Sequence, residues 1–415
     1  MSRPAAGRRL TPLQTLVIGQ ILIGTASWAA LIAVQTKASY ELHQQALFLA
    51  AVAMAWGAPT ILLSPLVGKT IDSRGPRTVG IAATLLSAAA SLGLVLTDGP
   101  ALLWSMTLLS GIARAFAQPA ADAMPSWLPG PAEHVKSSVW LGFATSVPMI
   151  AGPALAATLV ATSGTASAFT ANAIAFLLGG SVFLLLRPHR TPAGGESKDT
   201  PATDGQRGGM RALLAHPGLR VTITLTLIVW ISYGALTPLE ILYIKSVLHE
   251  PAGTFATIEM VFGAGLLTAT LLIARYTSLL ARRFFLPFSV LMVGAGQVLY
   301  SASHSLTFAY LGVGLWGLAA GLFGPACRLS LLQNTPTAQH GRAMALWRAV
   351  QSFGNLAPPT VAGVAAHFAG IQPTIVAIGS LVVITGAVAF TLTRSRPAAE
   401  TPVPSATSAP QPEKV

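Results

Sequence analysis

Charged side chains are scarce in this sequence. Only 9% of the 415 residues are charged, and 13 of them are acidic, whereas a soluble protein carries roughly a quarter charged residues. So few charges cannot cover a water-exposed surface, and the mean hydropathy of +0.64 indicates that lipid covers most of it. Cysteine is also nearly absent. The lone Cys327 excludes a disulfide framework and a cysteine-based metal site within a monomer.

Long apolar runs take the place of the missing charges. A helix needs about 20 apolar residues to cross the hydrocarbon core of a bilayer. The first run, Leu13 to Val34, follows Arg3, Arg8 and Arg9 and is too long for a signal-peptide core, so we expect it to be retained. Twelve helices are predicted near 13–34, 45–67, 78–97, 101–122, 138–160, 167–187, 219–240, 254–274, 284–303, 307–331, 343–366 and 371–393.

The distribution of Lys and Arg predicts which side each loop faces. With the N-terminus inside, the outer loops hold only Lys37 and Lys245, and almost all other cations fall in cytoplasmic segments. This asymmetry follows the positive-inside rule, and it places both termini in the cytoplasm. It also accounts for most of the net charge of +12 without a nucleic-acid partner.

The predicted spans fall into two halves of six. We expect an N-terminal bundle at 1–187, a cytoplasmic linker at 188–218, a C-terminal bundle at 219–393 and a disordered tail at 394–415. The halves align without gaps at an offset of about 206 residues. Matched pairs include Gly57 with Gly263, Gly111 with Gly317, Pro153 with Pro359 and Gly164 with Gly370. Chance identity in Leu- and Ala-rich helices is the alternative, but the constant register favours a parallel repeat with a cavity between the halves.

A glycine- and charge-rich segment, residues 68–77, connects the second and third spans. It reads GKTIDSRGPR, and we expect a short turn in which Asp72 pairs with cations or caps a neighbouring helix. An ordinary cytoplasmic loop is the simpler alternative. The segment resembles the signature loop of the major facilitator superfamily, G-x-x-x-D-R-x-G-R-R. Gly68, Asp72, Gly75 and Arg77 match that pattern, while Ser73 and Pro76 replace two of its cations.

A second resemblance narrows the family. Residues 111–177 contain QPAADAMPSWLP and AEHVKSSVWLGFATSVPMIAGPALAATL, which are similar to the branch that includes macrolide-efflux and enterobactin-export proteins. Gly152 and Pro153 resemble the antiporter motif of exporters, although Ala156 and Ala157 replace its following glycine pair. The resemblance implies an all-α fold of twelve transmembrane helices in two bundles and transport by alternating access.

Charged residues inside predicted spans are candidate functional residues, because burying them in a membrane is costly. Arg114 lies in the fourth span. It is a candidate cavity residue, and the alternatives are a structural partner of Asp122 or a snorkelling side chain. The family resemblance makes Asp122 with Arg77 a candidate relay of the gate motif. Glu240 and Glu259 are candidates for proton coupling, or else acids wetted at the outer interface.

Aromatic side chains are the candidates for the cavity wall. Trp28, Trp230, Tyr233 and Trp316 fall in spans one, seven and ten, which line the cavity in the family that the chain resembles. Trp and Tyr also gather at membrane interfaces, so each position has that alternative reading.

The leading hypothesis is a secondary transporter in a bacterial-type inner membrane that exports hydrophobic or amphipathic molecules in exchange for protons. A siderophore or metabolite exporter is the second hypothesis, and a non-transporting receptor or scaffold is the alternative from another class. No nucleotide-binding loop, nucleophile motif or metal-ligand spacing is visible. We therefore expect no enzymatic activity, cofactor or metal, and a monomer whose partners are the small-molecule substrate, protons and the lipid bilayer.

Overall fold

A computed structural model describes residues 11–124, 144, 147–185, 217–276, 282–335, 339–356 and 358–395. Most of the predicted linker and nearly all of the predicted tail lie outside these residues. Every element of regular secondary structure in these residues is a helix. The first half contains α1 (Pro12–Thr36) with its continuation η1 (Lys37–Glu41), α2 (Ala46–Leu62), α3 (Ser64–Arg74), α4 (Pro76–Val95), α5 (Pro100–Ala123) and α7 (Pro148–Leu185). The second half contains α9 (Pro217–Ser246), α10 (Ala252–Arg275), α11 (Phe285–Ser301), α12 (Leu306–Gln333), α13 (His340–Leu356), α14 (Pro358–Ala369) and α15 (Ile371–Ser395).

Helix starts follow local signals in the sequence. Thr11 caps α1 through a reciprocal pair of hydrogen bonds with Gln14, which satisfies backbone donors that a helix start leaves free. Proline occupies one of the first two positions of α1, α3, α4 and α5, where its missing N–H costs nothing. The chain thus begins each of these helices at the point where proline is tolerated.

The element α7 contains two membrane spans. Its backbone leaves the helical conformation at Gly164, with φ +79° and ψ 175°. Both ends of α7 pack against residues 19–24 of α1, whereas Thr165, beside the break, donates a hydrogen bond of 2.6 Å to Glu41 at the far end of η1. The chain therefore reverses at Gly164, as the two predicted spans at 138–160 and 167–187 require.

Two further predicted spans are each built from two helices. The helices α2 and α3 meet at a bend of 56°, and the eleventh span consists of α13 and α14. By length and hydropathy, eight described helices could cross a membrane, with α2 and α3 forming a possible ninth span as a bent pair. Counting both arms of α7, the short apolar helix α11 and the pair α13–α14 gives the predicted twelve.

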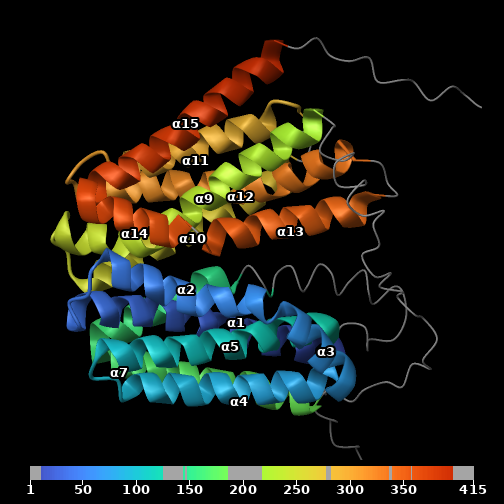
Figure 1. Ribbon diagram of the computed structural model, residues 1–415, viewed down its shortest axis with the longest axis vertical. Helices are drawn as coiled ribbons and strands as arrows, with labels where there is room; N and C mark the ends of the chain where they lie inside the picture. The colour runs from blue at the N-terminus through green and yellow to red at the C-terminus, as the bar shows by residue number, and fades with distance from the viewer. Residues whose placement is uncertain are drawn as a thin grey trace, which may run out of the picture.

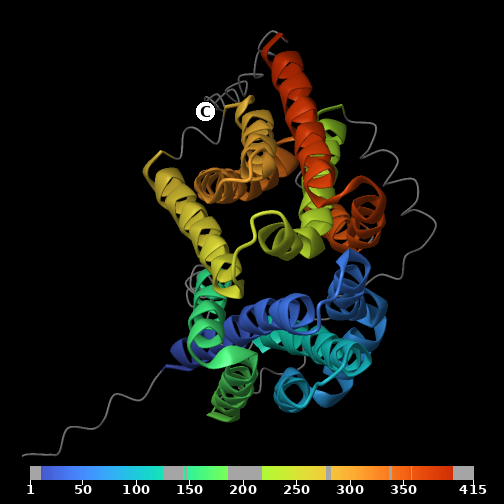
Figure 2. The ribbon, with the colours of Figure 1, turned by 90° about the vertical axis from the view of Figure 1, so that its left-hand side faces the viewer.

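The two halves lie side by side, with α1–α7 forming one bundle and α9–α15 the other (Figures 1 and 2). Their packing repeats. A methyl group on Gly111 of α5 would collide with the backbone of α2 at Ala55, and one on Gly317 of α12 would collide with the backbone of α10 at Phe262. Glycine therefore permits the same close helix approach at the same position of both halves.

The outer surface of the bundles is apolar. Large side chains such as Leu62, Leu96, Leu271 and Phe368 are each more than 70% exposed. In water this would be an aggregation hazard, but a bilayer is the solvent that such a surface requires. The fold is that of a multi-pass membrane protein.

Candidate transport site

A cavity of about 540 Å³ lies between the two halves. Its wall draws on α1, α2, α5 and α7 from the first half and on α9, α10, α12, α13 and α14 from the second. The volume falls within the range of about 300–1,000 Å³ that drug-sized ligands occupy. All five residues proposed for the cavity from the sequence line it, and so do both candidate proton-coupling acids: Trp28, Arg114, Trp230, Tyr233, Trp316, Glu240 and Glu259.

Arg114 is the charged residue of the first-half wall. Its guanidinium lies 3.8 Å from the centroid of the Trp56 ring, and its Nη2 donates a 3.3 Å hydrogen bond to Thr60. Among the described residues, no group accepts a hydrogen bond from its buried Nε–H. Asp122, which the sequence offered as a partner, instead accepts a hydrogen bond of 3.1 Å from Gln118. The structure thus places Arg114 in the cavity without that carboxylate.

The second-half wall is an aromatic cluster. Tyr233 stacks on Trp316 with ring centroids 5.4 Å apart and lies 5.6 Å from Trp230. Phe262 meets Trp316 edge-on at 5.3 Å. Such rings offer a flat, rigid apolar surface. The indole N–H of Trp230 is buried and has no hydrogen-bond partner among the described residues.

Two carboxyl groups share this wall. Glu240 of α9 is only 7% exposed, and Glu259 of α10 lies close enough to repel it electrostatically. The α9 helix continues to Ser246, beyond the predicted end at residue 240. Glu240 therefore lies within the helix, and its side chain lines the cavity.

Other lining residues escaped the sequence analysis. Trp56, Phe262 and Trp347 belong to the cavity wall, together with the polar side chains of Gln35 and Gln351. One signal could have identified two of them. Trp56 and Phe262 occupy equivalent positions of the repeat, each beside a matched glycine, so an aromatic residue at the same position of both halves was visible.

The halves are joined at one end of the cavity, which we call the closed end. There the Tyr40 hydroxyl donates a 2.8 Å hydrogen bond to the carbonyl of Glu250, and Lys245 donates to the carbonyl of Ser39. Gly363 of α14 packs against the α2 backbone at Ala46. These contacts separate the cavity from this end of the molecule.

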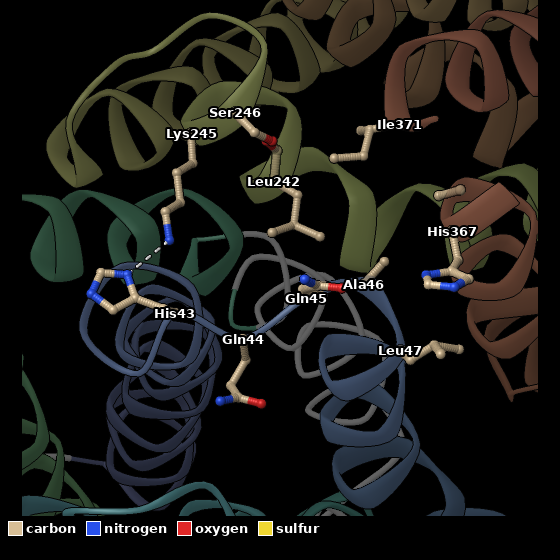
Figure 3. Close-up of a pocket in the computed structure, with 11 residues that line it drawn as sticks. His43, Gln44, Gln45, Ala46, Leu47, Leu242, Lys245, Ser246, His367 and Ile371 are labelled. Carbon is tan, nitrogen blue, oxygen red and sulfur yellow. Dashed lines mark hydrogen bonds between the residues drawn. The ribbon is translucent and has the colours of Figure 1, made fainter. Parts of the chain in front are cut away.

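A second cavity of about 350 Å³ lies at the closed end. Figure 3 shows Lys245 extending from the end of α9 toward His43, with Nζ 3.4 Å from Nδ1. His43 and its repeat counterpart His249 both have left-handed backbones, with φ of 52° and 59°. His249 contacts the carbonyl of Val247 in its own turn, whereas His43 contacts Lys245 of the other half.

The 68–77 motif differs from the expected short turn. Residues 64–74 form α3, and the motif becomes a turn only at Gly75, where φ is +80°. A residue with a side chain rarely adopts this conformation, which explains the glycine. Pro76 then begins α4, so the expected connection is mostly helix.

The charges of the motif form no relay with Asp122 in this conformation. Arg77 donates a 2.6 Å hydrogen bond to the carbonyl of Leu184, near the C-terminal end of α7, where a cation is favoured. Asp72 is exposed on α3. Asp122 experiences the charge of Arg348 from the other half, so the structure does not bring the predicted Asp122–Arg77 pair together.

The Gly152-Pro153 pair has a packing role. A methyl group on Gly152 would lie 2.5 Å from Cβ of Trp28 and 3.0 Å from the carbonyl oxygen of Thr25. Glycine therefore lets α7 approach α1 directly behind a cavity residue. Ala156, which replaces a family glycine, is fully buried. No group of three or more His, Cys, Asp or Glu within the described ranges could hold a metal ion.

Two helical bundles with a lipid-facing exterior enclose an aromatic cavity that carries a few polar groups, which is the architecture expected of a membrane transporter. The model of the Major Facilitator Superfamily matches residues 16–248 and 222–414, and the chain belongs to this family. The uncharacterised MFS-type transporter YfiS of Bacillus subtilis (strain 168) is 24% identical over 388 residues, covering 90% of this chain and 91% of its own.

Solved structures share the fold. A bacterial homologue of the human lysosomal transporter Spinster, in an inward-facing and unoccupied conformation, has a TM-score of 0.71 at 14% identity and covers 93% of this chain and 98% of its own. The nucleoside transporter NupG has a TM-score of 0.71 at 11% identity, covering 94% and 100%. These similarities show the fold, and the family indicates a transporter of small molecules rather than an enzyme.

Proposed function

We propose that the protein exports amphipathic small molecules in exchange for protons, by alternating access of the central cavity. The observation that carries the proposal is the cavity itself, in which an aromatic wall and two neighbouring carboxyls lie at the interface of two repeated bundles. The rings suit an apolar substrate body, and the acids suit a proton.

The orientation follows from the positive-inside rule. Lys37 and Lys245 are at the closed end, and they are the cations that the sequence analysis assigned to outer loops. The closed end is then the outer face, and both termini lie in the cytoplasm of a cell with this protein in its inner membrane. In this conformation the cavity is therefore closed to the outside of the cell.

The acids provide a route for coupling. A carboxylate buried without a cation is costly, and taking up a proton removes that cost. When the cavity opens outward, Glu240 and Glu259 can take up a proton, and when it opens inward, they can release it. Substrate and proton then compete for one charged region of the wall, which is the requirement for exchange.

Accumulation measurements test the proposal. In an efflux-deficient host, cells that express the protein should retain less of at least one compound from a panel of amphipathic drugs and siderophores, and a proton uncoupler should abolish the difference. Glu240→Gln should abolish uncoupler-sensitive export, whereas Asp98→Asn, on an exposed turn, should retain it. Unaltered accumulation of every compound despite good expression would refute export. Export that the uncoupler does not affect would refute the exchange for protons.

Siderophores belong in the panel because the sequence resembles the branch that includes enterobactin export. A host that secretes less siderophore when the gene is absent would identify a metabolite exporter of the same mechanism. A receptor without transport activity would bind ligand but change no accumulation.

A further inference from the structure

The central cavity is electrically divided between the two halves. Its charged lining residues are Arg114 on the first half and Glu240 and Glu259 on the second, among the described residues. The repeat explains how the charges separate. The counterpart of Arg114 in the second half is Ala320, and the counterpart of Glu259 in the first half is Ala53, so each half carries one sign.

In the described part of the chain, the positive side has no anionic partner. The guanidinium of Arg114 is stacked on Trp56 and bonded to the Thr60 hydroxyl, and its buried Nε–H has no acceptor there. A guanidinium is shaped to hold an oxyanion through two parallel hydrogen bonds. A buried cation with a free N–H is therefore prepared for an anionic group that a ligand brings.

The negative side has no Lys, Arg or His among the described residues of the second half that line the cavity. Glu259 and Glu240 repel one another, and the aromatic rings of Tyr233 and Trp316 lie on the same wall. A protonated amine is stabilised both by carboxylates and by the faces of aromatic rings. An amine of the ligand can therefore replace a proton on this pair.

We propose that the transported molecule is a zwitterionic amphiphile, bound through its carboxylate by Arg114 and through its protonated amine by Glu240 and Glu259, with a flat apolar body against Tyr233 and Trp316. This inference rests on the proposed function and names its substrate class. Such a ligand contacts both halves at once, and its ammonium group releases one proton from the acid pair as it binds.

A matched set of ligands separates the two charges. The four compounds share a biphenyl core: 4′-(aminomethyl)biphenyl-4-carboxylate, its methyl ester as the cation, biphenyl-4-carboxylate as the anion and methyl biphenyl-4-carboxylate as the neutral molecule. Binding to the purified full chain in lipid nanodiscs is measured by titration calorimetry in two buffers of different ionisation enthalpy, which also counts released protons.

The zwitterion should bind the wild-type protein most tightly. Arg114→Gln should weaken the binding of the zwitterion and of the anion by about tenfold to a hundredfold, the range expected for a lost charged hydrogen bond. The affinity for the cation should be unchanged. The double variant Glu240→Gln/Glu259→Gln should weaken the binding of the zwitterion and of the cation, and it should abolish proton release on binding. Arg220→Gln, at an exposed position at the start of α9, is the charge-matched control and should change nothing.

Three results would overturn the inference: a neutral compound that binds as tightly as the zwitterion, an Arg114→Gln variant that weakens all four compounds equally, and no binding of any compound by folded protein. Each variant's thermal unfolding is recorded, so that a misfolded protein is recognised and replaced by Arg114→Lys, which keeps the charge but not the two-pronged geometry. Binding without altered accumulation in cells would instead contradict the proposed export.

Discussion

Lys245 is the cross-half contact whose loss should open the closed end. Its ammonium group donates to the carbonyl of Ser39 and lies 3.4 Å from His43 Nδ1. A hydrogen bond from a charged donor contributes about 1.5–3 kcal/mol when shielded, but Lys245 is partly exposed, so we expect about 1 kcal/mol. Lys245→Met should therefore shift the ratio of closed to open molecules about fivefold toward the open state.

Distances between spin labels measure this shift. Labels at Leu47→Cys on α2 and Phe368→Cys on α14 lie on opposite halves at the closed end, and both positions are exposed. The native Cys327 is fully buried, so it should remain unlabelled. Double electron–electron resonance should show a larger population of long label-to-label distances in Lys245→Met than in the parent protein.

Two controls make the test specific. Lys245→Arg keeps the cation and should keep most of the short-distance population. His249→Ala removes a left-handed histidine whose ring contacts the carbonyl of Val247 in its own turn, and should leave the distribution unchanged. The reasoning is refuted if Lys245→Met has no effect, or if His249→Ala opens the closed end equally.

The remaining predictions concern glycine and the 68–77 motif. Gly317→Ala should lower the thermal unfolding temperature, because the new methyl group collides with the α10 backbone and overpacking costs about 1–3 kcal/mol; Gly57→Ala, with open space around it, should not lower it. Gly75→Ala should destabilise the protein by about 1–2 kcal/mol, since φ is +80° there, as urea- or heat-induced unfolding would show. Asp72→Asn should reduce the export rate in cells at equal expression; unchanged turnover would contradict its assignment to the gate.

The arrangement of spans was predictable because it depends on local composition. Apolar length, the bias of Lys and Arg, and the register of matched glycines are all one-dimensional signals, and they led to twelve spans in two halves. The helical state of α3 was missed, although Pro65 follows Ser64 as a helix-start signal. The glycine at position 68 favoured a turn in the sequence, but in the structure it has open space and fits in a helix.

Contacts of individual side chains were less predictable. A pairing of Arg114 with Asp122 looked reasonable because both lie in one span, yet eight residues of helix separate them by about 12 Å. The actual neighbour, Trp56, comes from another helix, and no pattern within one span reports that distance. The separation of charge between the halves likewise appears only when both are seen around one cavity.

The turns at the closed end have a practical consequence. Left-handed residues occur at four of them, namely His43, Gly164, His249 and Gly370, and each reverses the chain within a few residues. Because these turns are short, inserted residues would disturb the ends of the helices that they connect. An epitope tag or a fluorescent reporter inserted at any of these four positions should therefore destabilise the closed end.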